Sequence, residues 1–118
     1  MANIEYFKKY KKIYMIGIGG ISMSGIAEIL KNWGFEVSGS DITDSEIIKN
    51  LRNTGINITI GHNVDALKNA DLVVYTAAVK QDDPELLAAH ENNIPTIERK
   101  DLVGELTKAF SESICISG

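Results

Sequence analysis

The sequence has few of the features that mark secreted, membrane-spanning or cysteine-rich proteins. Its single cysteine, Cys115, excludes an internal disulfide and a cysteine-rich metal site. The longest nearly uncharged apolar run, Leu72–Val79, is far too short to span a bilayer. The polar and basic start, MANIEYFKKYKK, is not followed by an apolar segment, so no signal peptide is visible. These observations predict a soluble cytoplasmic domain with no membrane partner.

Positive charge is also scarce. The 12 basic residues are outnumbered by 16 acidic ones, which gives a formal net charge of −4. Non-specific binding of nucleic acid needs a basic face that neutralises phosphates, so the charge balance argues against it. The length of 118 residues and the 44% hydrophobic content fit one domain, residues 1–118, with its own core.

Short β-branched runs alternate with segments of helical periodicity along the whole chain. Strands are expected at 13–18, 35–39, 56–60, 72–76, 94–97 and 113–116. Helical spacing of apolar residues follows Ile21, and Asp83-Pro84 is typical of a helix start. Strands separated by helices form βαβ units. The pattern therefore predicts an α/β fold: a Rossmann-like, doubly wound, mostly parallel sheet with helices on both faces.

A glycine-rich loop, Gly17–Ser22, lies between the first expected strand and the first expected helix. In this context Gly17 lets the chain turn off the strand, and Gly19 lets a phosphate approach the backbone without meeting a Cβ. Free N–H groups at the start of the helix would hold the anion. The third position of the fingerprint is Ser22 rather than glycine. The alternative is that these glycines only form a tight turn.

Asp41 lies just after the second expected strand, where Rossmann domains place a carboxylate that accepts from ribose hydroxyls. It is alternatively a cap for the next helix. Loop and carboxylate together indicate a nucleotide with a diphosphate, and they do not separate NAD from a nucleotide sugar. No His/Cys/Asp cluster has metal-ligand spacing and no catalytic triad is evident, so neither a metal site nor a catalytic residue is predicted.

Two motifs, GIGGISMSGIAEIL at 17–30 and VSGSD at 37–41, resemble the Mur ligase family. The resemblance continues through Thr76-Ala77-Ala78, Pro84-Glu85 and Ile94-Pro95. It implies the N-terminal domain of a multidomain ligase that adds L-alanine to UDP-N-acetylmuramic acid, with ATP, in peptidoglycan synthesis. This domain would bind the UDP part of the substrate.

The resemblance also implies which residues touch the substrate. The pyrophosphate would be held by the amides of the loop and first helical turn: Gly19, Gly20, Ile21, Ser22, Met23 and Ser24. Ser40 and Asp41 would face the uridine, while Thr76 and Ala77 would close the other side of the crevice. His62 would contact the uridine, or it is simply an exposed loop residue. Arg99 would reach the sugar or diphosphate, or it is a solvated residue at a helix start.

The last two residues, Ser117-Gly118, resemble the beginning of a phosphate-binding P-loop, with Gly118 as an ATP contact. The family then implies that ATP, Mg²⁺ and L-alanine bind in further domains of a longer enzyme. The 118 residues would bind the UDP-sugar weakly, need no cofactor and have no ligase activity of their own.

Three other interpretations stay open. One is an NAD-binding regulatory or dehydrogenase domain, which shares the same strand–loop–helix–strand–Asp plan. Another is the recycling ligase that attaches a ready-made tripeptide to the same UDP-muramic acid. The third is a non-catalytic interaction domain in which the glycine loop is unused.

Overall fold

The computed structural model describes residues 10–117. Strands and helices alternate along them as follows: β1 (Lys12–Ile16), α2 (Ile21–Asn32), β2 (Glu36–Asp41), α3 (Glu46–Asn53), β3 (Asn57–Ile60), α4 (Val64–Leu67), β4 (Leu72–Tyr75), α5 (Pro84–Glu91), β5 (Thr96–Glu98) and α6 (Arg99–Ser117). None of the helices in these residues is long and apolar enough to cross a membrane.

The strands form one parallel sheet in the order β3-β2-β1-β4-β5. The central strand β1 pairs with β2 on one side, Ile13 opposite Val37, and with β4 on the other, Ile13 opposite Leu72. The chain therefore winds outwards from β1 to β3, crosses back, and winds outwards again through β4 and β5. Ligands of such sheets bind where this direction reverses, outside the carboxyl ends of the strands.

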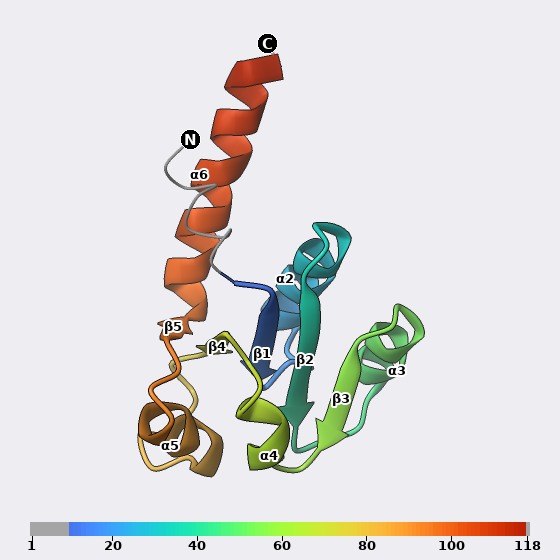
Figure 1. The fold of residues 1–118 in the computed structure, drawn as a ribbon. Coiled ribbons are helices and arrows are strands. Elements are labelled where there is room, and N and C mark those ends of the chain that lie inside the picture. The colour runs from blue at the N-terminus through green and yellow to red at the C-terminus, as the bar shows by residue number, and fades with distance from the viewer. Residues whose placement is uncertain (1–9, 118) are drawn as a thin grey trace.

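Both faces of the sheet are covered by helices, as Figure 1 shows. Successive side chains of a strand point to opposite faces, and β1 shows this alternation. Ile13 and Met15 pack into a core built with α2, α3 and α6. Tyr14 and Ile16 pack into a second core with α4 and α5. The predicted doubly wound α/β fold is confirmed.

The strand predicted at 113–116 is wrong, because these residues continue helix α6. No proline or glycine lies between residues 105 and 117 to stop the helix, and each added residue contributes another hydrogen bond. Figure 1 also shows α6 rising past the amino-terminal edge of the sheet, away from any strand that could pair with its last turns. The prediction for Gly118 lies outside the described residues.

Of two smaller elements, one differs from the sequence-based expectation and one agrees with it. The short helix α4, capped by Asn63, was not predicted in the segment that connects β3 to β4. Helix α5 begins as predicted, with Asp83 accepting hydrogen bonds from two backbone N–H groups and Pro84 in the first helical position.

Candidate functional site

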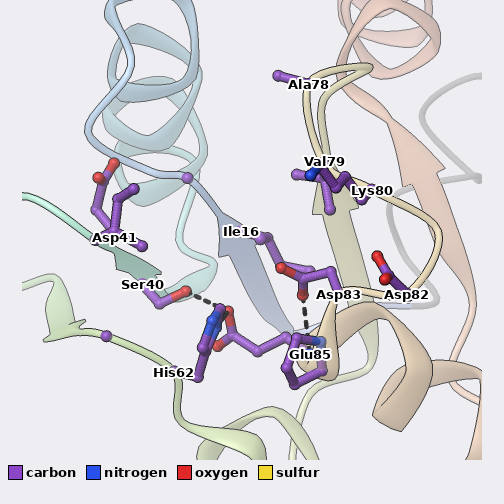
Figure 2. Close-up of a pocket in the computed structure, with 14 residues that line it drawn as sticks. Ile16, Ser40, Asp41, His62, Ala78, Val79, Lys80, Asp82, Asp83 and Glu85 are labelled. Atoms are coloured by element: carbon purple, nitrogen blue, oxygen red, sulfur yellow. Dashed lines mark hydrogen bonds and ion pairs between the residues drawn. The ribbon is translucent and has the colours of Figure 1, made fainter.

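A cleft of about 450 Å³ opens at the carboxyl ends of β1 and β2, beside the start of α5. Its lining includes Gly17, Ser40, Asp41, His62, Lys80 and Glu85. The cleft lies at the reversal of strand order, where the topology predicts a ligand. Figure 2 shows Ser40, His62 and Glu85 converging, whereas the Asp41 side chain points away from them.

The glycine loop turns sharply off β1. Gly17 has a φ of +79°, a left-handed conformation that glycine adopts without the steric penalty of a Cβ. The N–H groups of Gly17 and Ile18 donate to the Ser40 carbonyl at 2.8 and 3.0 Å, which ties the loop to the end of β2. The predicted role of Gly17 in the turn is confirmed by this geometry.

Three backbone donors at the start of α2 have no partner among the described residues. Gly20 is the N-cap, and no side chain caps the helix. The N–H groups that follow it, those of Ile21, Ser22 and Met23, belong to the first turn, which has no intrahelical acceptor. The N–H of Ser24 already donates to the Gly20 carbonyl at 2.8 Å. An anion placed here would meet three aligned N–H groups and the positive end of the helix dipole.

Asp41 is fixed against the glycine loop rather than free in the cleft. Its Oδ2 accepts from the Gly19 N–H at 2.9 Å, and its Oδ1 accepts from the Thr43 N–H at 3.1 Å. A Cβ added to Gly19 would lie 2.7 Å from Asp41 Oδ2 and 2.9 Å from Ile48 Cδ1. The missing side chain of Gly19 thus makes room for Asp41, a role that sequence reasoning had assigned to a phosphate.

Glu85 is fully buried behind the opposite side of the cleft, beneath the side chains of Ser40 and His62. Its Oε1 accepts from Ser40 Oγ at 2.6 Å and lies 3.2 Å from His62 Nδ1. Its Oε2 accepts from the Tyr14 hydroxyl and from the Asn63 N–H, the latter at 3.2 Å. Burial raises the pKa of the Tyr14 hydroxyl far above its ordinary range, and the hydrogen bond to Glu85 raises it further.

Sequence reasoning missed this carboxylate. Glu85 was noted only as part of a helix start, because its burial depends on partners from β1, β2 and the loop after β3. The only local signal was an acidic residue in the first turn of a helix. Oxygen and nitrogen atoms of His62, Asp83 and Glu85 lie within 4.8 Å of one another, close enough to surround a metal ion. Both Glu85 oxygens already accept hydrogen bonds, however, so we describe the cluster as a hydrogen-bond network.

The other predicted site residues lie around the cleft or beside it. Ile21 and Ser22 are exposed at the start of α2, whereas the Met23 side chain is buried in the core. Thr76 and Ala77 follow β4, but the next residues, 78–80, line the cleft in their place. Arg99 begins α6, directly after β5, and is not part of the cleft lining. Contacts of all these residues with a substrate stay predictions.

Comparison with known proteins identifies the family. Residues 12–111 match the Mur ligase family, catalytic domain. The chain belongs to the Mur ligase family. It is 56% identical over 110 residues to UDP-N-acetylmuramate–L-alanine ligase of Acetivibrio thermocellus, covering 93% of this chain and 24% of that relative. The Clostridium beijerinckii ligase of the same name is 54% identical over the same coverage. The chain thus spans about a quarter of the length of these curated relatives.

Solved structures of Mur ligases have the same fold. UDP-N-acetylmuramate-alanine ligase MurC from Thermotoga maritima superposes with a TM-score of 0.80 at 37% identity, covering 83% of this chain and 23% of that one. A UDP-N-acetylmuramate:L-alanyl-gamma-D-glutamyl-meso-diaminopimelate ligase from Neisseria meningitides gives 0.70 at 33% identity, covering 76% and 29%. An NADP complex of NmrA reaches 0.61 at 16% identity, which shows a shared fold alone. The similarities therefore favour a Mur ligase over the NAD-binding alternative.

Proposed function

We propose that this chain is the UDP-binding N-terminal domain of a ligase that adds L-alanine to UDP-N-acetylmuramic acid in peptidoglycan synthesis. The observation that carries the proposal is the set of three unpartnered N–H groups at the start of α2, beside the cleft. Because the chain is acidic overall, an anionic ligand is better held by backbone amides than by a cluster of lysines. Mur ligases with the same pattern supply the substrate class.

In this proposal the diphosphate lies on the amides of Ile21, Ser22 and Met23. The uridine extends into the cleft past Asp41, towards Ser40 and His62. Asp41 is held by two backbone N–H groups and has oxygen lone pairs left for ribose hydroxyls. Thr76, Ala77 and Arg99 lie outside the cleft lining, and their predicted contacts would involve the sugar or diphosphate rather than the base.

The chemistry of amide formation would take place elsewhere in a longer enzyme. ATP with Mg²⁺ would supply the phosphoryl group that activates the substrate carboxylate, but the glycine loop, GIGGISMS, has no P-loop lysine to hold its phosphates. Phosphoryl transfer from ATP would therefore not involve these residues. Their contribution is positioning: binding energy on the UDP moiety holds a remote carboxylate in place for reaction. We expect the protein in the cytoplasm, with UDP-N-acetylmuramic acid, L-alanine and ATP as partners of the whole ligase.

Ligand-dependent stabilisation tests the proposal directly. Thermal unfolding is followed with UDP, UDP-N-acetylmuramic acid, NAD⁺ and NADH at equal concentrations. A ligand at a hundredfold excess over its Kd stabilises the fold by about 2.7 kcal/mol. We expect stabilisation by the two uridine nucleotides. Stabilisation by NADH without any by UDP would overturn the proposal in favour of the dinucleotide alternative.

A single backbone donor can be removed without disturbing the fold. Ile21→Pro deletes one of the three N–H groups at the first helical position, where proline is well tolerated. Gly20 is already extended, with φ −66° and ψ 151°, as a residue before proline should be. The Ile21 side chain is 85% exposed, so its loss costs little packing. We expect UDP affinity to fall by about tenfold, as for one lost charge-assisted hydrogen bond.

Ile21→Ala is the matched control for this variant. It removes the same side chain and keeps the N–H, so its UDP affinity should equal that of the unmodified chain. Equal UDP binding by the proline and alanine variants would show that these amides do not hold the diphosphate. The unused-loop interpretation predicts this result.

A further inference from the structure

Glu85 connects helix α5 to three other parts of the chain through one buried carboxylate. Its partners come from β1 (Tyr14), β2 (Ser40) and the segment between β3 and α4 (His62 and the Asn63 N–H). Both carboxylate oxygens are used, each by two of these partners. Glu85 has no exposed surface, so a ligand in the cleft meets its partners rather than Glu85 itself.

The hydrogen atoms in this network can be assigned. A carboxylate only accepts, and the backbone N–H of Asn63 only donates. The second helical position of Glu85 places its negative charge at the positive end of the α5 dipole. Every neighbour of the carboxylate must then donate to it. For His62 this means that Nδ1 carries the proton and, in the neutral ring, Nε2 is a bare acceptor.

With the His62 ring in its neutral form, the cleft therefore offers acceptors on this side. The hydroxyl proton of Ser40 and the Nδ1 proton of His62 are both directed at Glu85. His62 lines the cleft with 44% of its side chain exposed, so its Nε2 is open to a ligand. A phosphate, which brings only acceptors at neutral pH, is a poor match there. An imide N–H of a base or a hydroxyl of a sugar is a good match.

We propose that Glu85 is a positioning residue that fixes His62 with Nε2 as a hydrogen-bond acceptor in the cleft, so that this side selects the donor-bearing, nucleoside end of the ligand. The proposal rests on the proposed function for the identity of that ligand, a uridine nucleotide. The proposal fixes the orientation of the bound ligand, with its phosphates at the start of α2 and its nucleoside beside His62. Glu85 itself does not touch the ligand.

The tautomer of His62 is measurable without any ligand or variant. Long-range ¹H–¹⁵N correlation spectra of the labelled chain distinguish a protonated Nδ1 from a protonated Nε2 in a neutral ring. The chain has only two histidines, and the other, His90, is exposed on α5 and serves as an internal reference. We expect His62 to hold the proton on Nδ1 at neutral pH. A His62 ring with the proton on Nε2 would overturn the proposal.

Binding of two probes then tests the selection. Glu85→Gln and His62→Asn are compared with the unmodified chain for UDP and for inorganic pyrophosphate. The asparagine amide can still donate to Glu85 but has no group in place of Nε2. We expect both variants to lose UDP affinity by about tenfold and to keep pyrophosphate affinity within about twofold. Because the His62 side chain is part-exposed, the asparagine variant remains informative even where the buried glutamine variant fails to fold.

The outcomes separate this inference from the proposed function. Equal UDP affinity in the His62→Asn variant and the unmodified chain would overturn the inference alone. Parallel loss of UDP and pyrophosphate binding would also overturn it, since that result indicates a general structural role. Absence of UDP binding by the unmodified chain would overturn the proposed function, and the tautomer measurement would still decide the role of Glu85.

Discussion

The two sides of the cleft are built in different ways. On the glycine-loop side, residues 17–24, the polar groups are backbone N–H donors that follow one another in the sequence. The other side, which we call the Glu85 side, consists of Glu85 and its partners Tyr14, Ser40, His62 and Asn63. Their donor groups bond to the Glu85 carboxylate, so the groups left for a ligand are acceptors. Of residues 17–24 only Gly17 lines the cleft, so the free donors lie next to the cleft, at the start of α2, and the acceptors lie within it. We proposed above that a phosphate binds at the first place and a nucleoside at the second.

The largest expected effect concerns the close approach of β2 to β1 beneath the glycine loop. A Cβ on Gly39, in β2, would lie 2.4 Å from the Met15 carbonyl oxygen and 3.0 Å from the Ile18 side chain. The first of these atoms is backbone and cannot move aside without shifting β1. We expect Gly39→Ala to lower the free energy of unfolding by about 3 kcal/mol, measured by urea denaturation.

Gly25→Ala is the control for this prediction. Gly25 is a glycine of α2 whose added Cβ would meet no atom within 4 Å outside the adjoining backbone of its own helix. Alanine there should raise stability by up to about 1 kcal/mol, because it favours the helix. Similar effects of the two substitutions would show that the loop does not depend on the close approach of β1 and β2.

On the Glu85 side, the corresponding test is Tyr14→Phe. The change removes a buried hydroxyl and leaves Glu85 Oε2 with one donor fewer. We expect a loss of about 2 kcal/mol in the free energy of unfolding. Tyr75→Phe is the matched control, because the Tyr75 hydroxyl makes no hydrogen bond among residues 10–108, whose side chains the structure describes. An equal loss of unfolding free energy at both positions would show that the hydrogen bond from Tyr14 to Glu85 adds nothing to stability.

The Tyr14 pKa also predicts the response to alkaline pH. The folded protein holds the phenolic proton more tightly than the unfolded chain, whose tyrosine pKa is about 10. The stabilisation linked to this shift is complete below pH 10 and is lost as the pH rises towards the folded pKa. We expect stability to decline above about pH 10 and the decline to be smaller in Tyr14→Phe. Denaturant midpoints measured across the alkaline range check this, and identical curves for both proteins would contradict it.

The fold was readable from the sequence where local signals were sufficient. Alternation within short runs predicted the five strands of the sheet to within one or two residues, and Asp83-Pro84 marked the start of α5. Residues 113–116 were wrongly predicted as a strand, because a short β-branched run also occurs at helix ends. Whether such a run finds a neighbouring strand to pair with depends on the whole sheet and cannot be read from the run itself. The four-residue helix α4 has too little periodicity to be recognised.

From local spacing, only the glycine-loop side of the site was readable; Ser40 and His62 on the other side were expected from the family resemblance alone, and both line the cleft. Gly17 and the start of α2 form a local motif, so spacing alone indicated an anion site. Asp41 was expected from its distance along the chain, although its bond to the Gly19 N–H was not. Glu85 acquires its role from Tyr14, Ser40 and His62, which are separated from it by 71, 45 and 23 residues. No pattern within one segment reports such a contact.

The smallest expected effect compares the caps of two helices of equal length. Asp83 caps α5, which carries Glu85, and Ser45 caps α3, which does not line the cleft. Asp83 Oδ1 accepts from the N–H groups of Glu85 and Leu86 at 2.9 and 3.2 Å. Either cap replaced by alanine should lower stability by about 1 kcal/mol.

The two cap variants should differ in binding, however. Asp83→Ala loosens the turn that places the Glu85 carboxylate, so UDP affinity should fall by about twofold to threefold while pyrophosphate affinity stays the same. Ser45→Ala lowers stability to a similar extent and should leave both affinities unchanged. Calorimetric titration of both variants decides the matter, since equal loss of UDP binding would trace the effect to stability rather than to the placement of Glu85.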